Sequence, residues 1–134
     1  AGGIRMVPAD GNVTVVGTIS ATAKSFDIPH PDKEGMRLVH GSLEGPEHGV
    51  YVRGHATEKV IELPEYWTGL VDEKTITVQL TANGRFQKLY VEKVENNKVY
   101  LRNASWFSNK IDCYYMINAT RKDIEEFEVE YGNS

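Results

Sequence analysis

The sequence contains a single cysteine, Cys113, so no disulfide can form within the chain and cysteine cannot build a zinc site. No apolar run approaches the roughly 18 residues that a membrane-spanning helix needs, and no signal peptide is evident. Acidic residues outnumber basic ones by 19 to 15, and no cluster of Lys or Arg offers the positive surface that nucleic-acid backbones require. We therefore expect neither membrane insertion nor nucleic-acid binding.

The signatures of common enzyme classes are also missing. There is no phosphate-binding loop, no Gly-x-Ser-x-Gly motif and no His-Glu-x-x-His motif. The four histidines lack metal-site spacing, because two ligands on one strand are expected two residues apart: His30, His40, His48 and His55. A metal site assembled from separate strands stays open. The sequence predicts a structural or binding module, not an enzyme, with no cofactor and no metal.

One cluster invites a catalytic interpretation. His40, Ser42 and Glu44 lie close together and would share one face of a strand. Successive residues on such a face are about 7 Å apart, which is too far for a direct hydrogen bond between Ser and His. We favour a structural role, in which Glu44 forms a salt bridge or caps the turn and His40 packs in the core, satisfied by a backbone group.

The composition is that of an ordinary globular domain, with 134 residues, 40% hydrophobic and 25% charged. Residues 1–23 are rich in small side chains, and Val13, Val15, Gly17 and Ile19 alternate with polar or small neighbours after a turn at 8–12. We expect this segment to be a thin β-shaft-like strand of an intertwined multi-chain assembly. A loosely packed N-terminal hairpin or a simple arm is the alternative.

Residues 24–134 alternate short strand patterns with turn residues. We expect at least seven strands in this region, drawn from segments 25–28, 36–44, 50–53, 60–63, 75–81, 86–94, 99–102, 111–118 and 127–131. Asn83-Gly84 predicts a hairpin, and Asn96-Asn97 predicts a turn. One short helix is expected over 64–71, since Pro64 suits the first helical position and Glu65 suits the first turn. The fold class is an all-β antiparallel sandwich or barrel.

The last expected strand has two different faces. Phe127, Val129 and Tyr131 alternate with three glutamates, so one face is apolar and the other is acidic.

An aromatic pair, Trp106 and Phe107, lies in a polar loop between two expected strands. Loops carry function more often than strands do. We predict a receptor-binding site there, with hydrogen-bonding groups from Asn103, Asn109 and the neighbouring serines 105 and 108. The alternative is that Trp106 is a plug that seals one end of the sheets. The other aromatic candidates are Tyr66, Trp67, Tyr114 and Tyr115, and a packing role is more natural for the pair in the short helix.

Several unusual motifs occur in order along the chain: KSFDIPHP at 24–31, Gly35, Arg37-Leu38, HGSLEGPE at 40–47, GVYVRG at 49–54, IELPEYW at 61–67, GLV at 69–71, TITV at 75–78 and RKD at 121–123. Together they resemble a C-terminal module of bacteriophage tail-fibre and other virion structural proteins, over residues 24–131. The resemblance implies a homotrimer in the virion, with other virion proteins as partners and a host cell-surface glycan as a contact.

Two further interpretations stay open. Some fibre C-terminal domains are chaperones that trimerise and then cleave themselves, but the sequence context of their nucleophilic Ser is not found here. A plain carbohydrate-binding module would need no virion. The chain begins at Ala1 without Met, so we expect it to be part of a larger parent protein.

Overall fold

The computed structural model describes residue 9 and residues 11–132. Strands make up 41% of it, so the fold is mostly β, with eight strands, one short α-helix and three small antiparallel sheets. The predicted all-β antiparallel architecture is confirmed. Within the described residues the sheets stay open, and no barrel closes.

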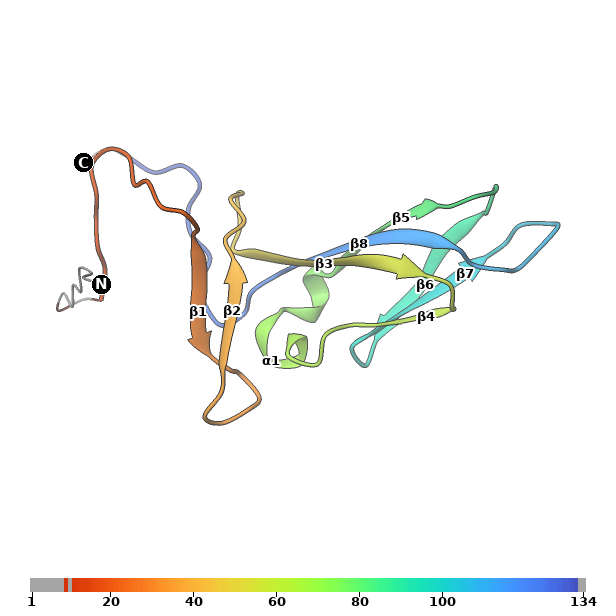
Figure 1. The fold of residues 1–134 in the computed structure, drawn as a ribbon, viewed down its shortest axis with the longest axis horizontal. Helices are drawn as coiled ribbons and strands as arrows, with labels where there is room; N and C mark the ends of the chain where they lie inside the picture. The colour runs from red at the N-terminus through yellow and green to blue at the C-terminus, as the bar shows by residue number, and fades with distance from the viewer. Residues whose placement is uncertain (1–8, 10, 133–134) are drawn as a thin grey trace.

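Each sheet is built from short antiparallel strands (Figure 1). Strands β1 (Ser25–Pro29) and β2 (Arg37–Gly41) form a separate hairpin. The second sheet has the order β3 (Gly49–Ala56), β8 (Cys113–Thr120) and β5 (Thr77–Ala82). The third has the order β4 (Val60–Glu62), β7 (Lys98–Asn103) and β6 (Leu89–Glu95). Figure 1 shows the two three-stranded sheets together, with the β1–β2 hairpin at one end of them.

A single apolar core joins these elements. Side chains alternate between the core and solvent along β3, β7 and β8, as half-buried antiparallel strands require. The helix α1 (Trp67–Leu70) adds two completely buried side chains. The main contributors are Val50 of β3, Ile61 of β4, Val99 and Leu101 of β7, Cys113, Ile117 and Ala119 of β8, and Trp67 and Leu70 of α1.

The predicted helix is confirmed in place, but it starts later than expected. The carbonyl of Pro64 accepts a hydrogen bond from Trp67 N at 2.9 Å, so Pro64 precedes the helix. A 3₁₀ turn, η1 (Glu73–Thr75), follows. The β1–β2 hairpin packs closely on α1, because a Cβ at Gly69 would lie 2.6 Å from Pro31 Cβ. Thr68 also donates a 2.9 Å hydrogen bond to the carboxylate of Asp32.

The two predicted asparagine turns have different outcomes. Asn96 and Asn97 have φ angles of 55° and 58° and join β6 to β7 in a tight hairpin, as expected. The hairpin predicted at Asn83-Gly84 is wrong. Gly84 has φ 81°, but β5 pairs with β8 and β6 pairs with β7, so this turn carries the chain from one sheet to another.

The strand predicted at 127–131 is also wrong for the single chain. Residues 121–132 are irregular after an isolated bridge at Arg121, and Phe127, Val129 and Tyr131 are 43%, 63% and 83% exposed. The physical reason is that β8 has no edge left to pair with this segment. Strand β8, from which this segment continues, is already paired with β3 on one edge and β5 on the other.

The strand predicted over 13–20 does not form within the chain. Residues 11–24 contain no strand, and their apolar side chains are exposed, including Val15 at 47%, Ile19 at 66% and Val16 at 99%. The alternative N-terminal hairpin does not form among these residues either. Residues 1–8 and 10 of the expected shaft, including Ile4 and the turn residue Pro8, lie outside the described residues. The shaft, which would form only between several chains, therefore stays a prediction. The domain boundary at residue 23 stays a prediction as well.

Candidate functional site

The aromatic loop, residues 104–112 between β7 and β8, is held firmly at its base. The Oδ1 atom of Asn103 accepts hydrogen bonds from Ser105 N at 2.9 Å and Lys88 N at 3.0 Å. Its Nδ2 group donates to the carbonyl of Lys110 at 2.6 Å. Ser108 Oγ accepts a further bond from Lys110 N. One asparagine thus ties both ends of the loop and the start of β6 together.

The loop projects its aromatic pair into solvent. Trp106 and Phe107 are each 93% exposed, so the interpretation of Trp106 as a plug is wrong for this chain. Asn109 is exposed beside them. Asn103 differs from the expectation, because both of its polar side-chain atoms are engaged within the protein. It positions the loop and is not available as a contact residue.

The other aromatic candidates are divided by burial. Trp67 is completely buried, which fits the packing role, and Tyr66 is half-buried. Tyr115 lies over Gly54 of the neighbouring strand, where a Cβ would come within 2.6 Å of its hydroxyl. Tyr114 is 52% exposed on the outer face of the same sheet. None of these four side chains belongs to the aromatic loop.

A polar network that the sequence analysis missed anchors the C-terminal end of the loop. Gln87 is 7% exposed and bonds Asp112 twice, donating to its carbonyl at 2.7 Å and accepting from its N–H at 2.8 Å. The Asp112 carboxylate bonds the His55 ring and Asn83 Nδ2. These bonds, that from His55 foremost, lower the pKa of Asp112. No sequence motif marks Gln87, since its partners are distant along the chain.

A second cluster lies where the hairpin, β3 and the C-terminal segment meet. Arg121 donates a two-pronged pair of bonds to Asp123, at 2.9 and 2.7 Å, with its side chain only 10% exposed. Its guanidinium also lies 4.2 Å from the centre of the Phe26 ring. Its backbone N–H donates to the carbonyl of His48 at 2.8 Å. The hydrogen bonds from Arg121 are the main cause that lowers the pKa of Asp123.

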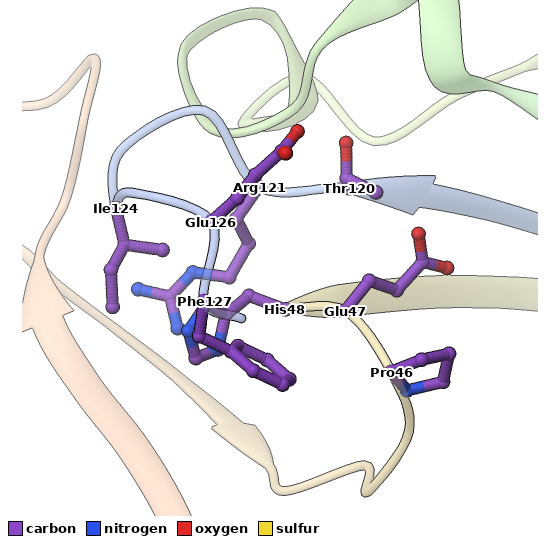
Figure 2. A pocket seen from close by; sticks show the side chains of 8 residues that line it. All are labelled: Pro46, Glu47, His48, Thr120, Arg121, Ile124, Glu126 and Phe127. Atoms are coloured by element: carbon purple, nitrogen blue, oxygen red, sulfur yellow. The ribbon is translucent and has the colours of Figure 1, made fainter. Parts of the chain in front are cut away.

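Beside Arg121 is a hollow of 230 Å³ (Figure 2). The rings of His48 and Phe127 meet there at 4.7 Å. The charged groups that line the hollow have both signs, and the Arg121 guanidinium is already paired with Asp123. The lining residues are Pro46, Glu47, His48, Thr120, Arg121, Ile124, Glu126 and Phe127.

The ring of Phe26 continues the cluster toward α1. It stacks on His40 at 4.9 Å, and His40 meets Tyr66 edge-on at 5.3 Å. Burial lowers the pKa of His40, and the charge of Arg121 acts in the same direction. Because the folded pKa lies below the ordinary value of about 6.5, this contribution to stability is complete above that pH and is lost on acidification. A backbone hydrogen bond at Val39 acts on this pKa in the opposite direction, and the buried Nδ1 atom of His40 has no hydrogen-bond partner among the described residues.

The remaining sequence candidates lie apart from the aromatic loop. Ser42 and Glu44 are exposed, and Glu44 forms the predicted salt bridge, with Lys24. The described histidine, cysteine and acidic side chains form no group of three that could hold a metal ion. Burial raises the pKa of the Cys113 thiol, which therefore stays protonated near neutral pH. The exposed aromatic loop is the arrangement best suited to recognition.

No protein-family model, curated protein or solved structure matches this chain. The helices of the described chain are four and three residues long, and neither has the length or apolar character to cross a membrane.

The Arg121 cluster generates a stability prediction. Arg121→Lys keeps the charge but loses the two-pronged bond and the flat contact with Phe26, so we expect a loss of about 1–3 kcal/mol in the free energy of unfolding. Arg102 supplies the control, because it makes a similar two-pronged pair with Glu92 at the surface. Arg102→Lys should cost less than about 1 kcal/mol. Urea denaturation measures both, and equal losses would contradict the role given to Arg121.

Proposed function

We propose that this chain is a structural module of a bacteriophage virion appendage, a tail fibre or similar, which forms a homotrimer and presents the aromatic loop to the host surface. The observation that carries the proposal is the N-terminal segment. It has the alternation of a strand, yet Val13, Val15 and Ile19 are 54%, 47% and 66% exposed in the single chain. Symmetric association of such segments would give each chain the core that it lacks alone.

The position of the aromatic loop supports separate roles for the two ends of the molecule, attachment at one and host contact at the other. Figure 1 places the loop between β7 and β8 at the end of the molecule opposite the described N- and C-terminal segments. A module joined to a shaft at one end and carrying a contact surface at the other suits an appendage tip. The resemblance of residues 24–131 to virion modules points the same way.

The loop also has the chemistry of glycan recognition. Aromatic side chains stack on sugar rings and lose little conformational entropy when they do so. The exposed side chain of Asn109 can supply hydrogen bonds. The ties made by Asn103 hold the loop in place before any ligand arrives, which reduces the cost of ordering it on binding. We therefore assign the host contact to Trp106, Phe107 and Asn109, with Asn103 as a positioning residue.

Self-cleavage has less support. Ser20, Ser25 and Ser42 are exposed, and no described histidine or carboxylate bonds their hydroxyl groups to activate them. We place the module outside the enzymes.

The proposed assembly predicts the mass in solution. Light scattering coupled to gel filtration, at low micromolar concentration, should give a trimer for the whole chain. Changing Val15 and Ile19 together to Asp should give a monomer, because carboxylates would lie in the shared apolar face. The matched control changes Thr14 and Thr18 to Asp, on the opposite face of the same strand pattern, and should stay trimeric. A stable monomer or dimer for the unchanged chain would refute the proposal.

The loop predicts a separation of binding from stability. Trp106→Ala should alter the free energy of unfolding by less than about 0.5 kcal/mol, because the side chain is almost fully exposed. It should abolish adsorption to host cells or glycans. Trp67→Ala, at a completely buried position, should instead cost about 3–5 kcal/mol. Unchanged adsorption by a folded Trp106→Ala trimer would refute the assigned surface, and saturable glycan binding by a stable monomer would favour a plain carbohydrate-binding module.

A further inference from the structure

Strand β3 lies at the edge of its sheet, and its outer edge has no strand partner among the described residues. All eight residues of β3 pair with β8 in a regular register, and no other described strand lies along its opposite edge. Every second N–H and C=O of an edge strand points outward, and a long unprotected edge is a template for another strand. Strand β3 contains no proline and no bulge that would block such pairing.

Space for an added strand exists beside this edge. A cleft of 460 Å³ lies between the beginning of β3 and the end of β2. Its walls include residues 49–53 of β3, together with His40 and Tyr66. The cleft therefore lies along the same residues of β3 whose outer edge lacks a partner.

The C-terminal segment, residues 126–131, has the alternating pattern of a strand that could pair with the free edge of β3. Phe127, Val129 and Tyr131 alternate with glutamates, and all three apolar side chains are at least 43% exposed in the single chain. A sequence with period-two alternation specifies a strand with one buried face. Here the pattern is present, but the described chain covers this face only in part, through the contact of Phe127 with His48.

The two segments also match in charge and in alternation. On β3, Val50 and Val52 face the core, whereas Tyr51 and Arg53 face solvent. Arg53 makes no ion pair with any described residue, and neither do the tail glutamates. A tail strand with its apolar side chains beside the two valines would place its glutamates on the face of Arg53.

The geometry points to a second copy of the chain as the source of this strand. Thr120, where the tail leaves β8, pairs with Gly49 at the beginning of β3. Phe127 then contacts His48, just before that strand. In Figure 1 the tail continues toward the N-terminal segment and away from the rest of β3. We propose that residues 126–131 form a strand on the free β3 edge of a neighbouring copy, an inference that rests on the self-association proposed above.

Hydrogen exchange read by mass spectrometry, on the whole chain, tests the proposal. In the assembled protein the amides of 126–131 should be protected, together with those of β3. In the monomeric variant with Val15 and Ile19 changed to Asp, the protection of 126–131 should disappear. Protection that persists in the monomer would mean pairing within one chain and would overturn the proposal. Protection of residues 13–19 in place of 126–131 would overturn it as well.

Charge variants identify the edge. Arg53→Glu should weaken the protection of 126–131 by about fivefold, and changing Glu128 and Glu130 to Lys in the same chain should restore it. Arg85→Glu is the control, since Arg85 is exposed and makes no described ion pair, and it should leave protection unchanged. A trimer with an unprotected tail overturns this inference alone, whereas a monomeric unchanged chain overturns the proposed function.

Discussion

The contact between the Arg121 guanidinium, the Phe26 ring and the Asp123 carboxylate is the interaction on which the arrangement of the fold depends. The β1–β2 hairpin shares no backbone pairing with either three-stranded sheet. Its attachment therefore relies on side chains: Arg121 against Phe26, Thr68 bonded to Asp32, and Pro31 close to Gly69. A largely buried guanidinium must be paired to be tolerated, and Asp123 supplies that pairing from two residues away. The backbone N–H of Arg121 also donates to the carbonyl of His48, which fixes the chain at the end of β8.

The two ends of the molecule differ in character. At one end, the Asn103 and Gln87 networks hold a loop whose aromatic side chains have no role in the core. At the other, the N-terminal and C-terminal segments carry strand patterns that the single chain does not use. Strand patterns that stay unpaired in one chain are expected where symmetric copies of that chain would complete its core. Both proposals above follow from this contrast.

The sequence predicted local features well and partner choice poorly. The turn at Asn96-Asn97 was predictable because both residues tolerate positive φ, and the strand expected at 75–81 is found as β5. Asn83-Gly84 misled because a turn signal does not say whether the next strand pairs with the last one. Here the bonds of Gln87 to Asp112, 25 residues away, direct the chain elsewhere. The Arg121 cluster was equally hidden, since Phe26 and Arg121 are far apart in sequence and meet only in the fold.

The central claim, that Arg121 holds the hairpin to the rest of the fold, is open to direct observation by nuclear magnetic resonance. The Arg121 Nε–H donates to Asp123 beneath the Phe26 ring, so its resonance should be displaced by the ring current. It should also exchange slowly with water and show cross-relaxation to the Phe26 ring protons. The Arg102 Nε–H, in an exposed pair, is the internal reference. An Arg121 resonance that exchanges as fast as that of Arg102 and shows no contact with Phe26 would contradict the account.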